Sequence, residues 1–126
     1  MPMLGAILTP HPPVLLPEVG RGREQAIAAT GRAMEKAAKA VAQWNPDVLI
    51  IASPHTVLYG DYFHIAPGQS AEGSMAAFRA PQVQFTATYD APLRDEIIRR
   101  AENAGLTAGI LGQRDPSLDR GVLIPL

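Results

Sequence analysis

Two apolar runs in this chain end in the same phrase, a small hydroxyl residue followed by proline and histidine. Residues 4–8 precede Thr9-Pro10-His11, and residues 48–52 precede Ser53-Pro54-His55. Proline cannot donate to a sheet ladder and favours an extended residue before it, so each phrase is typical of the end of a strand. We therefore predict two buried strands. The second should be central, because it is apolar at every position.

A helical pattern separates the two runs. From residue 19 to residue 43, apolar and small side chains recur at the spacing of one helical face, and Asn45-Pro46 follows as a stop signal. A strand, a helix and a second strand in this order form a parallel unit with a right-handed crossover. The carboxyl ends of parallel strands meet at one sheet edge, where α/β proteins bind ligands, so we expect His11 and His55 to lie together there.

The second half of the chain predicts shorter elements. Strands are expected at residues 62–66, 83–88 and 108–111, and residues 67–81 have no periodicity and are predicted to form a loop. A second helix should begin at Asp90 as N-cap, carry Pro92 in its first turn and end at Gly105. Together these patterns predict an α/β fold with a mostly parallel central sheet flanked by helices.

The C-terminal segment is strongly apolar. Residues 121–126 include Val122, Leu123, Ile124 and Leu126, with no polar tail after them. We expect this surface to be buried against a partner, either a second copy in a homo-oligomer or a missing C-terminal half. On this interpretation, residues 1–126 are a single α/β domain that is incomplete at its C-terminus and forms the N-terminal portion of a larger α/β domain.

Composition narrows the chemistry further. The 11 basic and 12 acidic residues give a formal net charge of -1, which offers no general attraction to nucleic acid or to an anionic membrane. The chain has no cysteine, so disulfides, thiolate catalysis and cysteine-ligated metals are excluded. It also lacks a signal-peptide pattern and an apolar run of membrane-spanning length, and a cytoplasmic location is therefore expected.

Two converging imidazoles suggest a metal site. A lone histidine is more often structural, but two in matching contexts favour a shared ligand pair. A third ligand, usually a carboxylate, completes such sites in non-haem iron proteins, and zinc hydrolases use a similar set. The nearest carboxylates in the sequence are Glu18, Asp47, Asp61 and Asp119. Glu18 equally suits the start of a helix, and His64 has no matching context and is interpreted as structural or exposed.

Three segments resemble a known family: residues 5–13, the Ser53-Pro54-His55 phrase and residues 118–126. They resemble the catalytic subunits of class III extradiol ring-cleavage dioxygenases, most closely the branch associated with the AmmeMemoRadiSam system. The resemblance implies that His11 and His55 ligate Fe(II) and that the substrates are O2 and a small catecholic or related aromatic compound. It also implies a third ligand, a glutamate, beyond the end of this chain.

One position departs from the family pattern. Where the family commonly has Asp-His-Gly, this chain has Asp119-Arg120-Gly121. A guanidinium group stays protonated, so Arg120 cannot act as the base that a histidine could be. Arg120 could still steer an anionic substrate.

Three functions remain open on the sequence alone. The first is an Fe(II)-dependent extradiol-type dioxygenase domain whose third ligand is missing from this chain, so that the chain by itself is inactive. The second is a non-catalytic relative that binds a protein partner. The third is a hydrolase that holds Zn(II) through the same two histidines. None of the three involves nucleic acid or a membrane.

Overall fold

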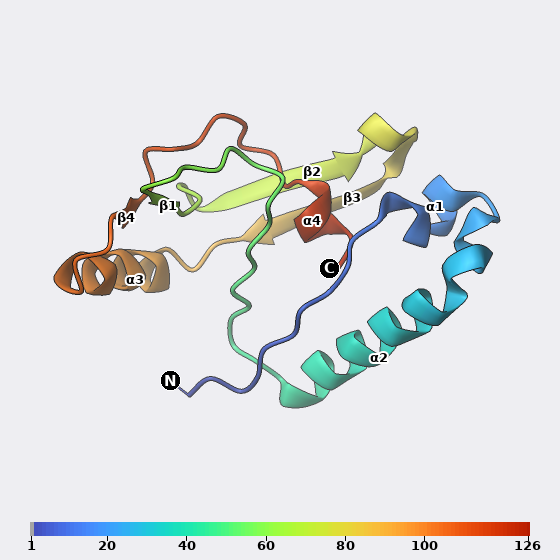
Figure 1. The fold of residues 1–126 in the computed structure, drawn as a ribbon, viewed down its shortest axis with the longest axis horizontal. Coiled ribbons are helices and arrows are strands. Elements are labelled where there is room, and N and C mark those ends of the chain that lie inside the picture. The colour runs from blue at the N-terminus through green and yellow to red at the C-terminus, as the bar shows by residue number, and fades with distance from the viewer. Residues whose placement is uncertain (1) are drawn as a thin grey trace.

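Helical segments make up the first part of the chain, and strands and helices follow, in the computed structural model, which describes residues 2–126 (Figure 1). In chain order the elements are η1 (Pro13–Leu15), α1 (Pro17–Gly20), η2 (Arg23–Ile27), α2 (Ala28–Trp44), β1 (Phe63–His64), β2 (Ser70–Met75), η3 (Ala76–Phe78), β3 (Ala80–Thr88), α3 (Ala91–Asn103), β4 (Ala108–Gly109) and α4 (Arg120–Leu123). β1 and β4 form a small parallel sheet, and β2 and β3 pair antiparallel. The predicted α/β class is confirmed, and the arrangement is compatible with the N-terminal portion of an α/β domain.

The two apolar runs before the histidines are extended, but they are not strands. Residues 4–8 and 48–52 belong to neither sheet of the described residues, and Leu8 and Ile50 are 100% and 76% exposed. The prediction of two buried strands is therefore wrong, because no neighbouring strand pairs with their backbone or covers their side chains. The two segments nevertheless run in the same direction (Figure 1). Gly5 lies against the indole of Trp44 at their start, and His11 meets His55 at their end.

The long helix begins later than the sequence predicts. The expected start at residue 19 is wrong, because the backbone turns at Arg21 and Gly22, where φ is 52° and 98°, before α2 begins. Its end is as predicted, with Asn45 in the left-handed conformation at φ 48°. Asparagine tolerates this conformation better than most residues, and the chain leaves the helix there.

A hairpin replaces the loop predicted for residues 67–81. β2 pairs with β3 from Ser70 opposite Thr88 to Ser74 opposite Gln84, and a register shift follows at Met75. The prediction was wrong because the backbone ladder to β3, rather than an alternation of apolar side chains, holds β2 in place. The strand expected at residues 83–88 is confirmed as part of β3.

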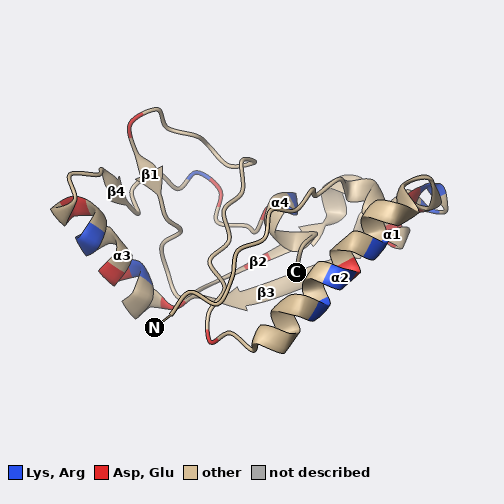
Figure 2. Ribbon diagram, turned by 60° about the horizontal axis from the view of Figure 1, so that its bottom comes forward, with Lys and Arg blue, Asp and Glu red and all other residues tan. Residues whose placement is uncertain are grey.

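The remaining local predictions are confirmed. The Asp90 carboxylate accepts a hydrogen bond from the Leu93 N–H at 2.9 Å, so it caps α3, and Gly105 follows that helix at a φ of 76°. The short strands expected near residues 62–66 and 108–111 are β1 and β4. Charged residues are frequent along α2 and α3, whereas the extended segments that lead to the histidines are almost free of them (Figure 2).

The C-terminal segment is part of a small core. Leu123 and Ile124 are 7% and 9% exposed and pack with Met75 and Ala80 of the hairpin. The expectation that this segment needs a partner to cover it is therefore wrong for these two side chains, because β2 and the start of β3 cover them. Leu126 is 43% exposed.

No helix among residues 2–126 has the length and apolar character needed to cross a bilayer.

Candidate metal centre

His11 and His55 lie against each other at the ends of the two extended segments. Their ring centroids are 4.7 Å apart and the ring planes are 85° apart. Each follows a proline, whose ring restricts the backbone leading into the histidine. His11 is half-buried and His55 is exposed. The structure thus brings together the two histidines singled out in the sequence, although the segments that carry them do not pair in a sheet.

A cluster of hydrogen bonds joins the His55 segment to α4. The Ser53 hydroxyl and the Gly121 N–H each donate to Asp119 Oδ1 at 2.6 Å, and the His55 N–H donates to Ser53 Oγ at 3.3 Å. A Cβ at position 121 would lie 3.0 Å from His55 Cδ2 and closer still to the Ser53 hydroxyl, so a larger residue would have to displace these side chains. The cluster therefore holds α4, and with it Arg120, against His55.

Arg120 contacts His55 directly. Its Nε donates to His55 Nε2, and a terminal guanidinium nitrogen approaches His55 Nδ1, each at 3.4 Å. The two nitrogens of an imidazole point in diverging directions, so one guanidinium cannot bond both of them in the ring plane. The guanidinium therefore lies within 3.4 Å of both ring nitrogens while bonding at most one of them in the ring plane. Its carbon also lies 5.6 Å from the centroid of the Phe78 ring, within cation–π distance.

Two adjoining cavities share His55, Phe78 and Arg120 in their linings. The smaller is an open depression of about 340 Å³, lined by His11, Pro12, Pro13, His55, Phe78 and Arg120. None of these lining residues is acidic. The larger, of about 550 Å³, extends to His64 and Arg114. His64 is half-buried there, and its Nδ1 has no hydrogen-bond partner among the described residues.

No carboxylate of the described residues completes a ligand set around the histidine pair. Within residues 2–126, no three histidine, cysteine, aspartate or glutamate side chains come together closely enough to hold a metal ion. Glu18 is exposed in the first turn of α1, and Asp47 and Asp61 are exposed as well. Asp119 is hydrogen-bonded to Ser53 and to its own helix. Neutral imidazole nitrogens suit Fe(II) and Zn(II), so the donor set fits a divalent metal through two ligands.

Few signals in the sequence indicated the contacts that surround the pair. Ser53 and Asp119 are 66 residues apart, and no spacing rule links them. Phe78 lies in the segment predicted to be a loop, and η3 turns it toward Arg120. The one available signal was the replacement of the family histidine by Arg120, which marked the position without revealing its contact with His55.

Comparison with known proteins identifies the family. A family model described as the catalytic LigB subunit of aromatic ring-opening dioxygenase matches residues 5–126. Protein CA_C1420 of Clostridium acetobutylicum is 35% identical over 133 residues, an alignment that covers 100% of this chain. The chain spans 28% of the length of that relative. No solved structure matches the chain. On the match over residues 5–126, the chain belongs to the family of the catalytic LigB subunit of aromatic ring-opening dioxygenases.

Proposed function

We propose that this chain carries the metal-binding histidines of a non-haem Fe(II)-dependent extradiol-type dioxygenase that acts on a catecholic or related aromatic compound. The observation that supports this most strongly is the 4.7 Å separation of the His11 and His55 rings. Family membership supports a reaction of the aromatic ring-opening class. A shared fold does not assign a function by itself, so the histidine pair carries the argument.

In this proposal, His11 and His55 hold the metal ion through one neutral imidazole nitrogen each. Iron, when bound, supplies the electron transfer between an aromatic ring and O2 that these groups cannot carry out alone. The third ligand is the glutamate that the family resemblance implies, outside residues 1–126. Zn(II) suits the same imidazoles, and the metal preference is therefore part of the test.

The residues around the pair would position the aromatic ring and handle its proton. Phe78, Pro12 and Pro13 line the smaller cavity with apolar surface against which a flat ring can pack. Arg120 stays protonated and cannot accept a proton from a substrate hydroxyl. His64 is the remaining histidine of the chain and lines the larger cavity together with His55, so it is the proposed proton acceptor.

Anaerobic titration with Fe(II) tests the metal site. We expect one weak site per chain in the wild-type protein, lost in both His11→Ala and His55→Ala. His64→Ala is the matched control, since it removes a histidine outside the pair and should leave binding intact. Unchanged binding in His11→Ala would contradict the proposal. Absence of binding in the wild-type protein would favour the non-catalytic relative.

Ring opening tests the reaction. With Fe(II), O2 and a catechol, we expect no product above background from the 126-residue chain. Two ligands hold the metal loosely, so the aromatic compound and O2 are poorly positioned for reaction. Product formation by this chain would contradict the proposed external ligand and would imply that Glu18 or Asp61 completes the site.

A further inference from the structure

We propose that Arg120 competes with the metal ion for the histidine pair, and that an oxyanion carried on an aromatic ligand relieves this competition. The inference rests on the proposed function, because it concerns the same two histidines. It assigns Arg120 two linked effects. The free guanidinium weakens metal binding, and a guanidinium paired with a carboxylate does not.

Arg120 contacts His55 where a metal ion would bind. Nitrogens of the Arg120 guanidinium lie 3.4 Å from both ring nitrogens of His55. A metal ion must take one of these two nitrogens, so it would have to bind beside a permanent positive charge or displace it. A divalent ion and a guanidinium at such a distance repel each other, even after screening by water.

No acidic group of the described residues neutralises Arg120. Among residues 2–126, the ion pairs involve only Arg94, Arg99 and Arg100. The neighbouring Asp119 forms no ion pair with Arg120, and its Oδ1 is occupied by Ser53 and Gly121. The smaller cavity has three nitrogen-bearing side chains in its lining and no carboxylate. Asp115 and Asp119 line the larger cavity, and neither forms an ion pair with Arg120. The charge of Arg120 is therefore available to an anion that enters the smaller cavity.

The cavity beside Arg120 suits a carboxylate on an aromatic ring. A guanidinium presents parallel N–H groups that match the two oxygens of a carboxylate. The Phe78 ring lies 5.6 Å from the same guanidinium, and the two prolines add apolar walls to the cavity. These surfaces favour a flat ring bearing a carboxylate over a small free ion. By linkage, a ligand that raises metal affinity must itself bind more tightly in the presence of metal.

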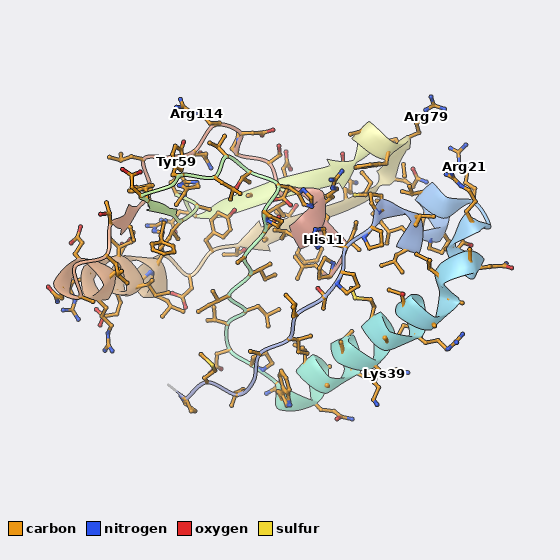
Figure 3. All side chains as sticks on the ribbon, viewed as in Figure 1. His11, Arg21, Lys39, Tyr59, Arg79 and Arg114 are labelled. Carbon is orange, nitrogen blue, oxygen red and sulfur yellow. The ribbon has the colours of Figure 1, made fainter. Side chains whose placement is uncertain are left out.

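Calorimetric titration with Co(II) at fixed pH and salt tests the competition. Arg120→Gln should bind Co(II) about tenfold more tightly than the wild-type protein, because the repelling charge is gone. Arg120→Lys keeps the charge and should bind like wild type. Arg79→Gln removes one positive charge at the hairpin turn, from a side chain that lies away from His11 (Figure 3), and should have no effect. Matching thermal unfolding curves would show that the variants are folded.

The same titration in the presence of benzoate tests the coupling. Benzoate should raise the Co(II) affinity of the wild-type protein about fivefold. Phenol, its uncharged match, should not, and benzoate should have no effect on Arg120→Gln. The proposal is overturned if Arg120→Gln binds Co(II) no more tightly than wild type. It is also overturned if phenol acts like benzoate, or if the benzoate effect survives in Arg120→Gln.

Failure of the proposed function gives a different result. If the wild-type protein and Arg120→Gln both bind no Co(II), the metal site and the competition at it fail together. Benzoate binding to the metal-free protein then tests whether Arg120 binds an aromatic carboxylate. A loss of that binding in Arg120→Gln but not in Arg120→Lys supports Arg120 as the anion receptor, and equal binding in all three proteins excludes it.

Discussion

Two apolar segments of this chain have opposite surroundings. Leu123 and Ile124 of the C-terminal segment enter the core and are 7% and 9% exposed, while residues 48–52 stay extended and Ile50 is 76% exposed. The C-terminal segment begins in a turn capped by Asp119 and lies against the hairpin. The other segment has no strand beside it among the described residues. An apolar run is therefore buried only where another element is present to cover it.

The largest difference in stability between the two segments should appear when an aspartate is placed in each of them. Leu123→Asp should lower the free energy of unfolding by about 3–5 kcal/mol, because it loses a buried apolar side chain and buries an unpaired carboxylate. Ile50→Asp is the matched change in the exposed segment and should stay within about 0.5 kcal/mol of wild type. Urea unfolding measures both. Equal losses would show that residues 48–52 are covered in solution.

Replacing each of two glycines by alanine should give a smaller difference in the free energy of unfolding. Gly121→Ala should cost about 1–3 kcal/mol, because the added carbon meets His55 and the Ser53 hydroxyl and must displace these side chains or α4 itself. Gly31 lies in α2 with open space around it, and Gly31→Ala should stabilise the protein by about 0.5–1 kcal/mol through helix propensity. Unfolding curves that move in the same direction would contradict the close approach of α4 to the His55 segment.

These contrasts also explain what the sequence could predict. α3 was predictable because its signals are local, with Asp90, Pro92 and Gly105 at its boundaries. The repeated phrase singled out His11 and His55, and their rings do lie together, but the parallel strands from which we predicted this meeting are absent from the described residues. β2 was not predictable, because the hydrogen bonds to β3 that hold it pair two separate segments and leave no local signal in the sequence.

The contacts around the histidine pair were equally hidden. Arg120 and His55 are 65 residues apart, and their contact depends on the bonds that hold α4 to the Ser53 turn. Likewise, the composition of residues 48–52 is typical of a buried strand, although the segment is not one. Composition does not reveal whether a neighbouring strand exists.

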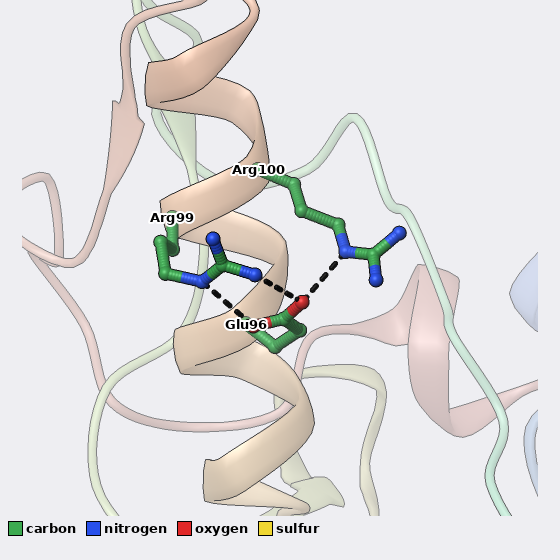
Figure 4. Close-up of polar contacts among 3 residues, drawn as sticks. All are labelled: Glu96, Arg99 and Arg100. Atoms are coloured by element: carbon green, nitrogen blue, oxygen red, sulfur yellow. Dashed lines mark hydrogen bonds and ion pairs between the residues drawn. The ribbon is translucent and has the colours of Figure 1, made fainter.

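The smallest effect should come from the ion pairs on α3. Hydrogen bonds from Arg99 and then Arg100 hold the pKa of Glu96 down to about 2, from an ordinary value of 4.5 (Figure 4). A lowered pKa contributes stability above the unfolded-state value, and this contribution is lost as pH falls from 4.5 toward about 2. The ion pairs lie at the surface, where the Arg99 and Arg100 side chains are 59% and 76% exposed, so the contribution is small and screened by salt.

Thermal unfolding of Glu96→Gln measures this contribution. The variant should melt slightly below wild type at neutral pH and low salt. The two curves should converge in acid and in high salt. A difference that persists in high salt would contradict a surface origin and would tie α3 to the core more closely than the structure indicates.

The claim that His11 and His55 share one metal ion is tested most directly by following the histidine ring nitrogens during titration. In ¹⁵N NMR spectra of the labelled protein with Zn(II), the ring signals of His11 and His55 should shift together and reach their end point at one equivalent. His64 lies outside the pair and should keep its ring signals through the same titration. A shift of only one member of the pair, or of His64 in place of either, would contradict the shared site.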